Sequence, residues 1–431
     1  QEAARKITIG SAVAGRTTVA CRTMPLMTCN PVEGSTPITQ DYPNPDPDQT
    51  GFSRLSDFLK EYPEWTRRQM RVKFIGPDTG YANGVFGLLE PNFSPNNGAK
   101  GIEDELALGV PASCIVLDSV TVGDADVKTG QAQTIVDGIN LRFDIYHGNW
   151  KNDKNDPDYP PGPDVIKGML PKNQGKICNP DFVEDENPDD LTGADLPDAK
   201  KLPQDECFTA ESAADLAGYS PKCYAFGAQD GSTITSKGNH GFAGRYGNGR
   251  YNLLRYFQVN HPSLVEDDGA GGFQIDQTTF DDIVDLEEAF LNANGMSAPD
   301  GSETASNPDV PPSRASVFEW EVTTNNIPSP SNTGSPEEEG TPQCSNQTPA
   351  GLERRNLYIA IINCQEHADA LNNGDRVVPV SEFGETFVTE PADHNGQGGS
   401  GDKGAIYVEF RRAVQPGSLN NVVLRDLIQL Y

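Results

Sequence analysis

The sequence is poor in basic residues and has no long apolar run. It carries 33 Lys and Arg against 63 Asp and Glu, which gives a formal net charge of −30. Nucleic-acid binding needs clustered Lys and Arg to displace counterions, so this balance argues against nucleic acid as a partner. No stretch approaches the roughly 20 apolar residues of a membrane span. The chain begins at Gln1 rather than Met, and we expect that an N-terminal targeting or anchoring segment was cleaved or left out. Contact with a membrane is therefore expected only through that missing anchor.

Motifs for catalysis are also missing. The sequence has no Gly-x-Ser-x-Gly, no His-Glu-x-x-His, no Walker motif and no dinucleotide-binding glycine pattern. The histidines at 147, 240, 261 and 394 are scattered, and we interpret them as surface or packing residues. Acid pairs such as Asp281/Asp282 are expected by chance among 63 acids, so they are no sign of glycoside hydrolysis. No catalytic residue is predicted, and we expect that the protein is not an enzyme.

The spacing of the cysteines predicts disulfides. A zinc site usually shows pairs two to four residues apart, whereas the closest cysteines here have seven residues between them. There is no Cys-x-x-Cys redox motif, and the even number points to an oxidising compartment. Closeness in sequence favours Cys21–Cys29, Cys207–Cys223 and Cys344–Cys364, which leaves Cys114–Cys178. Zinc or redox chemistry and free buried thiols are the alternatives. The eight cysteines predicted to form disulfides are Cys21, Cys29, Cys114, Cys178, Cys207, Cys223, Cys344 and Cys364.

Composition and periodicity predict a mainly β, α+β protein. The 43 glycines, 34 prolines and modest apolar fraction of 35% indicate many loops around an antiparallel β core. Helices are expected at 53–62, 98–109 and 279–294, the last capped by Thr279 and ended by Gly295. Strands are expected at 6–20, 67–76, 113–123, 138–146, 316–322, 357–364, 376–390, 405–412 and 420–431. The segments LYIAIINC, FGETFVTE and AIYVEF, the most strand-like of the chain, are predicted to be neighbours in the central sheet.

Three parts of the chain are expected. Residues 1–150 form a β-rich N-terminal part with two short helices, and 151–244 form an acidic, Pro-rich, disulfide-bearing excursion. Residues 245–431 form a β-rich C-terminal part that completes the core and contains the helical insert near 279–294.

One spacing suggests calcium. Asp46, Asp48, Thr50, Gly51 and Asp57 occupy positions 1, 3, 5, 6 and 12 of a calcium loop, with a helix following. Pro47, the absence of an entering helix, and Asp rather than Glu at position 12 depart from the pattern. The alternative is a solvated acidic turn that caps the helix at 53–62. Residues 153–158 (DKNDPD) are a second acid-rich candidate. Hard oxygen ligands without nearby His or Cys favour calcium over zinc.

Several segments together resemble the periplasmic part of TadG-like proteins of the bacterial Flp/Tad pilus assembly system, especially the alphaproteobacterial kind. They occur in the same order over nearly the whole chain. They are AVAGR through PLMTCNPVE, GVFGLLEP, GAKGIEDELALG, GINLRFDIY with KNDPDYPP, DECF, RYGNGRYNLLRYFQVNHP, RRNLYIAIINC, FGETFVTEPA, IYVEF and LIQLY. The resemblance implies a non-enzymatic envelope protein, anchored in the inner membrane by an N-terminal helix and associated with pilus biogenesis. This chain lacks the hydrophobic anchor and the Asp-x-Ser-x-Ser metal-adhesion signature of some TadG proteins, and its acidic inserts are long.

Three functional hypotheses follow. The first is a structural or assembly protein of a bacterial pilus or surface filament, located in the periplasm or at the cell surface, with other envelope proteins or further copies of itself as partners. The second is a calcium-stabilised adhesin or binding module of the cell surface. The third is a secreted hydrolase that uses an unrecognised pair of carboxylates.

Overall fold

The computed structural model describes a little under half of the chain. The described residues are 17–20, 26–30, 32–33, 51–61, 69–73, 85–89, 98–108, 115–117, 124–129, 135–163, 257, 261–267, 269, 273–296, 312–324, 326, 345–373, 377–389, 392, 406–414 and 424–427. These residues contain both helices and strands, so the protein is of the α+β class. No helix among them has the length and apolar character needed to cross a membrane.

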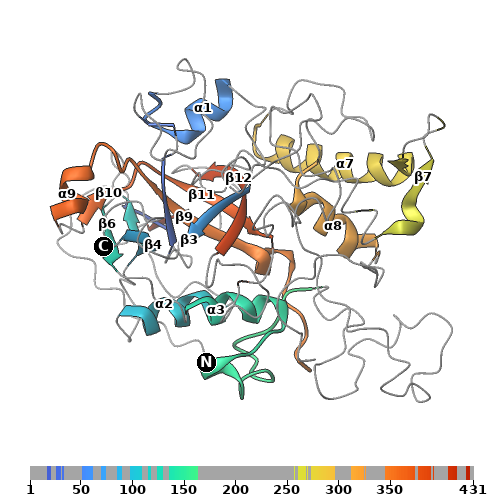
Figure 1. Cartoon of the computed structure of the whole chain (residues 1–431), viewed down its shortest axis with the longest axis horizontal. Coiled ribbons are helices and arrows are strands. Elements are labelled where there is room, and N and C mark those ends of the chain that lie inside the picture. Colours follow the sequence, from blue (N-terminus) through green and yellow to red (C-terminus); the bar gives the residue numbers. More distant parts are fainter. Residues whose placement is uncertain are drawn as a thin grey trace, which may run out of the picture.

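An eight-stranded sheet lies at the centre of the protein (Figure 1). Its order is β10-β6-β4-β2-β9-β11-β12-β3, and all neighbours are antiparallel except β2 and β9, which run parallel. Strands from the first third of the chain thus share one sheet with strands from the last fifth. The bounds are β2 (Leu26–Cys29), β3 (Gln69–Lys73), β4 (Val85–Leu89), β6 (Asp124–Thr129), β9 (Asn356–Ile362), β10 (Val377–Pro379), β11 (Glu382–Val388) and β12 (Ile406–Val414).

The predicted neighbours β9, β11 and β12 are adjacent, as expected. In β9 every residue from Leu357 to Ile362 is buried, so both faces of this strand are covered. A continuous apolar run is the pattern of such a doubly covered strand. The β9–β11 and β11–β12 pairs are antiparallel, and a register shift between Glu385 and Thr386 marks an irregularity in the second pair.

Helices cover the sheet on two sides. Figure 1 shows α1 (Leu55–Glu61) above the sheet, and α2 (Gly98–Ala107) with α3 (Val136–Asn140) below it. Phe58 of α1, Ile102 of α2 and Ile139 of α3 belong to the same apolar core as Ile359 and Val408 of the sheet. One core therefore joins elements from both ends of the chain.

The sheet is strongly curled. β3 pairs only with β12 among the described strands, yet β3 also lies against β2 and β4. The contact is made at Gly87 of β4, which has a φ of +85°, and a Cβ there would collide with the carbonyl oxygen of Val72. Only a residue without a side chain permits this approach of two backbones.

A pair of helices, α7 (Gln277–Ala293) and α8 (Arg314–Thr324), packs beside β11 and β12, with the hairpin β7 (Val265–Asp267) and β8 (Phe273–Ile275) at its far end (Figure 1). Phe257, Phe280, Ile283 and Trp320 form its apolar core. The predicted helix at 279–294 is present, but the expected cap was wrong.

The residue that caps α7 is Asp276, whose carboxylate accepts the backbone N–H of Thr279 at 2.9 Å. The helix therefore begins two residues before Thr279, and the capping carboxylate is three residues earlier than expected. Its end agrees with the prediction, since Gly295 adopts a φ of +64° immediately after Asn294.

The side chain of Arg355 connects α8 and the segment after α3 with the central sheet. Its guanidinium lies over the rings of Phe143, Phe318 and Phe387 at 4.3, 4.8 and 4.7 Å. It also donates two hydrogen bonds to the carbonyl of Val388 at the end of β11. Each ring belongs to a different element, so a single buried cation ties three elements together.

Two strand predictions were wrong. Residues 138–146 form the end of α3, a 3-10 turn (Leu141–Phe143) and a turn at Asp144, whose φ is +59°. Residues 316–322 lie in α8. In both segments tertiary packing overrides the local alternation. Gly138 allows α3 to lie directly against the backbone of Glu103 in α2, and α8 is buried on nearly every side.

The remaining elements are small. β1 (Thr17–Ala20) pairs with both β5 (Ile115–Leu117) and β13 (Leu424–Leu427) in a three-stranded sheet. A short helix α9 (Ala368–Asn373) follows β9. The strands expected at 6–20, 113–123 and 420–431 are thus present in part. The division into three parts stays a prediction, because 151–244 is described only as far as residue 163.

Candidate functional site

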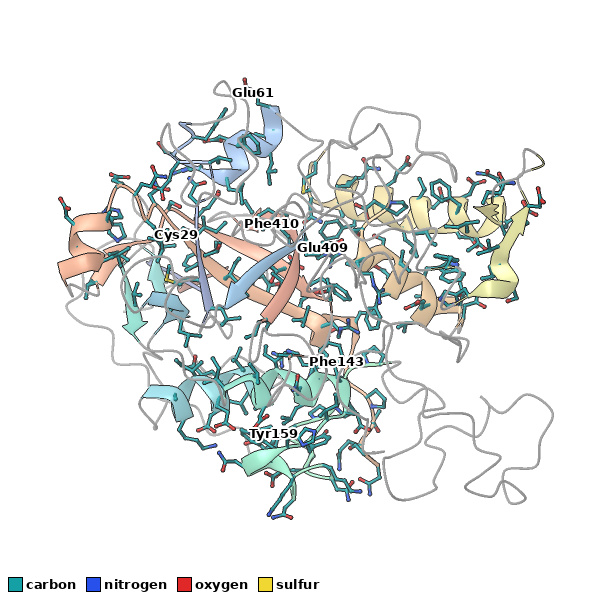
Figure 2. The ribbon with its side chains drawn as sticks, viewed as in Figure 1. Cys29, Glu61, Phe143, Tyr159, Glu409 and Phe410 are labelled. Atoms are coloured by element: carbon teal, nitrogen blue, oxygen red, sulfur yellow. A yellow bond between two sulfur atoms is a disulfide. The ribbon has the colours of Figure 1, made fainter. Side chains whose placement is uncertain are left out.

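The parallel strands β2 and β9 end side by side, and a disulfide joins their ends. Cys29 is the last residue of β2, and Cys364 lies two residues after β9, with 5.4 Å between their Cα atoms. Both are buried, with exposed fractions of 0% and 4%. Figure 2 labels Cys29 at the sheet.

This disulfide contradicts two predicted pairs, Cys21–Cys29 and Cys344–Cys364. Closeness in sequence was the wrong criterion, because the parallel pairing of Met27 with Ala360 and of Cys29 with Ile362 brings together residues 335 positions apart. The other six cysteines and the two other predicted pairs lie outside the described residues.

Two asparagines extend the junction beyond the disulfide. The backbone N–H of Asn30 donates to the carbonyl of Ile362 at 2.7 Å, which prolongs the β2–β9 pairing. The side-chain amide of Asn30 donates to the carbonyl of Phe52 at 2.8 Å and to Oδ1 of Asn363 at 3.0 Å. Asn30 therefore connects the ends of both strands with the segment that leads into α1.

Glu33 is a buried acid at the same junction. Its carboxylate accepts the backbone N–H groups of Gln365 at 2.8 Å and Glu366 at 3.4 Å. Burial raises the pKa of Glu33 to about 7, although hydrogen bonds from the backbone after Cys364 act in the opposite direction. The side chain holds the turn after the disulfide against the chain after β2.

The described end of the predicted calcium loop rests on this junction. The N–H of Phe52 donates to the carbonyl of Val32 at 3.0 Å, and the ring of Phe52 contacts that of Phe58 edge to face. Glu382 of β11 accepts the N–H of Ser56 at 3.0 Å in the first turn of α1, and burial raises the pKa of this carboxyl. The helix that follows the loop is thus fixed to the sheet.

Most of the predicted calcium ligands are outside the described residues. Asp46, Asp48 and Thr50 are not described. Asp57 lies in the first turn of α1, and its carboxylate accepts from Lys60 at 3.2 Å in an exposed ion pair. Gly51 adopts a φ of +87°, as the sharp turn at position 6 of a calcium loop requires. The calcium site stays a prediction.

The second acid-rich turn, at 153–158, is described. There a carboxylate oxygen of Asp156 accepts the backbone N–H of Asp158 at 2.9 Å. In the described part of the chain no group of three or more His, Cys, Asp or Glu side chains is arranged to hold a metal ion. The three aspartates of this turn are within that part, so the structure gives no support to calcium there.

A second buried polar group, which sequence reasoning missed, surrounds the beginning of α8. Glu409 of β12 is 0% exposed and accepts the backbone N–H groups of Arg314 at 2.7 Å and Ala315 at 3.2 Å. In Figure 2, Glu409 lies between the central sheet and the α7–α8 pair. An acid inside the apolar run IYVEF was the sequence signal for such a buried group.

Glu287 of α7 reaches the same helix end. Its carboxylate accepts the N–H of Ser313 at 3.1 Å and the hydroxyl of Ser316 at 2.5 Å. Further along α8, Glu321 binds the ring of His261 at 2.9 Å. We call Glu287 and Glu409, with the α8 groups that they bind, the α8 carboxylate cluster.

No protein-family model, curated protein or solved structure matches this chain.

At both sites the buried carboxyl groups connect neighbouring elements of the fold. A glycoside hydrolase needs two carboxyl groups that flank a substrate. Glu287 and Glu409 are 2% and 0% exposed and accept hydrogen bonds from Ser316 and Arg314 of α8, so the pair holds a helix. At the disulfide junction Glu33 and Glu382 likewise accept backbone N–H groups. These acids fix one element of the fold to another.

Proposed function

We propose that this chain is a non-enzymatic structural or assembly protein of a bacterial Flp/Tad-type pilus or surface filament, located outside the cytoplasm. The disulfide Cys29–Cys364 is the observation on which the proposal chiefly rests. Disulfides of this kind persist in oxidising compartments such as the periplasm and the cell surface. This one is buried and joins two strands of the central sheet. Both features are typical of a structural disulfide rather than an exposed redox pair.

The buried acids support a structural role. Glu33, Glu382 and Glu409 all have raised pKa values and all accept backbone N–H groups from a neighbouring element. Buried carboxyl groups used in this way fix the relative position of strands and helices. A protein that has to hold its shape within an assembly benefits from such internal ties.

The net charge of −30 and the order of the TadG-like segments support an extracytoplasmic assembly partner. Its proposed partners are other pilus or envelope proteins, or further copies of the chain.

Deletion of the gene in the bacterium that carries it tests this proposal. Electron microscopy of the deletion strain should show few or no surface filaments, and a plasmid copy of the wild-type gene should restore them. A copy with both Cys29→Ser and Cys364→Ser should restore them poorly, whereas Lys60→Ala, in an exposed ion pair, should act as wild type. Normal filaments in the deletion strain would refute the proposal.

A calcium-stabilised adhesin is the second candidate, favoured by the positive φ of Gly51 at position 6 of the predicted loop. Calcium that binds only the folded state adds about 2.7 kcal/mol of stability at a hundredfold excess over Kd. The melting temperature should then fall in EDTA and recover with calcium in the wild type but not in Asp48→Ala. An identical melting temperature with calcium and with EDTA would exclude this candidate and leave the pilus proposal standing.

A further inference from the structure

The two acids of the α8 carboxylate cluster come from different elements and meet at one helix end. Glu409 belongs to β12 and Glu287 to α7, and both accept hydrogen bonds from the first residues of α8. Their exposed fractions are 0% and 2%, so water does not solvate either carboxylate. The contact between α8 and the sheet thus contains two acids in a position that is normally apolar.

The surrounding cations are shared between several acids, and the charge of Arg411 lowers the pKa of Glu409 without offsetting the effect of its burial. Arg411, next to Glu409 on the face of β12, lies 3.6 Å from Glu385 and over the ring of Phe290. The guanidinium of Arg314 lies 4.0 Å from Glu321. Among the described residues, the titratable and charged groups around the cluster are Arg411 on β12, Glu385 on β11, Glu287 on α7, Arg314 and Glu321 on α8, and His261 before β7.

The N-terminus of α8 favours a single negative charge beside it. The N-terminus of a helix carries about half a positive elementary charge, which stabilises a single anion but not two desolvated ones. Burial raises the pKa of Glu409 to about 7, against the opposing hydrogen bond from Arg314, and the charge of Glu287 adds to the rise. The pair therefore retains a proton up to about neutral pH.

We propose that Glu409 and Glu287 make the docking of α8 on the sheet dependent on pH. With one proton on the pair, the first turn of α8 is bound to β12. When Glu409 gives that proton to solvent water, two adjacent carboxylates repel each other without hydration, and the first turn of α8 separates from β12.

The direction of the effect follows from linkage. The pKa of Glu409 is about 7 when α8 is docked, against 4.5 for an unperturbed glutamate, so the docked state binds the proton more tightly. Docking is strongest below pH 4.5, weakens as the pH rises to about 7, and changes little above about pH 8. The equilibrium constant for opening should rise by roughly 100-fold over this range.

Hydrogen exchange of the full-length oxidised protein tests the proposal. Protection factors for residues 314–324, corrected for the intrinsic effect of pH on exchange, would be compared at pH 5.5, 7.0 and 8.5. In the wild type they should fall with rising pH, whereas in Glu409→Gln they should stay constant, because the amide keeps a hydrogen-bond acceptor without a charge. Glu33→Gln is the matched control, since Glu33 also has a pKa of about 7 but lies at the disulfide junction. It should retain the pH dependence of α8.

Glu287→Gln provides a second variant if Glu409→Gln does not fold. Without the neighbouring charge the pKa of Glu409 should drop, so the midpoint of α8 opening should move to lower pH. Constant protection of α8 in the wild type at all three pH values would overturn the proposal. The same holds if the pH dependence persists in Glu409→Gln, or if Glu287→Gln leaves the midpoint unchanged.

Discussion

Single buried acids decide where several elements of this protein meet. Glu33 binds the turn after β9, Glu382 binds the start of α1, and Glu409 binds the start of α8. Each is an acid that accepts hydrogen bonds from backbone amides, which satisfies both the acid and the amide. Loss of one of them would leave buried N–H groups without a partner, at about 1–3 kcal/mol each.

The first prediction concerns Glu33. Its pKa of about 7 in the folded protein exceeds the ordinary 4.5, so its contribution to stability is complete below about pH 4.5 and is lost as the pH rises through 7. Allowing for solvent screening, the free energy of unfolding should fall by about 1–2 kcal/mol more in the wild type than in Glu33→Gln between pH 4.5 and 8. Urea titrations at several pH values measure this difference. The exposed Glu61→Gln should follow the wild type, and an equal pH slope in wild type and Glu33→Gln would contradict the prediction.

The second prediction concerns Arg355, which lies over three aromatic rings and donates to the end of β11. Lysine keeps the charge but not the planar guanidinium, so Arg355→Lys should lower the free energy of unfolding by about 2–4 kcal/mol. Lys60→Ala removes a cation from an exposed ion pair and should cost less than about 1 kcal/mol. Urea denaturation compares the two. A loss of similar size in both variants would mean that the aromatic contacts contribute little.

At the scale of elements, the local sequence pattern predicted the strands and helices that bury a continuous or one-sided apolar surface. β9, β11, β12 and α7 were foreseen because their sequences show it directly. α8 was taken for a strand because Phe318, Trp320 and Val322 alternate with two glutamates, one of which, Glu321, is buried against His261 in the helix. Its start is fixed by Glu287 and Glu409, which lie 26 and 95 residues from the groups they bind, and no local window contains them.

The sequence predicted disulfide bonds at the candidate site but not which cysteines form them. The cysteine spacing indicated disulfides, and Cys29 and Cys364 were among the predicted residues, but their partners were wrong. Pairing depends on the parallel alignment of β2 with β9, and nothing in either strand specifies the direction of its neighbour. Glu33 and Asn30 were not singled out for the same reason, since their partners follow β9 more than 330 residues later.

The third prediction concerns the curl of the sheet at Gly87. Gly87→Ala would place a methyl group against the carbonyl of Val72 at a positive φ, so the free energy of unfolding should fall by more than about 4 kcal/mol. Gly295 also has a positive φ, of +64°, but a Cβ there would meet nothing within 4 Å. Gly295→Ala should therefore cost only about 1–2 kcal/mol. Circular dichroism during denaturation measures both, and equal losses would show that β3 and β4 are not in contact.

At the scale of the whole molecule, the disulfide joins strands from the two ends of the chain within one sheet. Its closed loop contains most of the protein, because the two cysteines are 335 positions apart. Cross-links over long loops restrict the unfolded chain most, by about 6 kcal/mol for a loop of this length in the entropic view. The disulfide therefore stabilises the whole fold rather than one local loop.

The fourth prediction is that all eight cysteines are oxidised. Alkylation in denaturant without a reductant should add no mass to the intact protein, and peptide mapping should recover a cross-linked peptide with Cys29 and Cys364. Full reduction before alkylation is the control and should add eight labels. Two or more labels without reduction, or a cross-linked peptide with Cys21 and Cys29, would contradict this prediction.

The parallel pairing of β2 with β9 also sets the timing of folding during synthesis. β2 leaves the ribosome 335 residues before the partner of its last cysteine, an interval of roughly 20–70 s at elongation rates of about 5–20 residues per second. During that interval β2 has no β9 beside it, and β3 has no β12. The centre of the sheet cannot close until the chain is almost complete. Most of the chain is therefore synthesised before the strands at the centre of the sheet can pair, so the nascent chain cannot reach its complete fold early in synthesis.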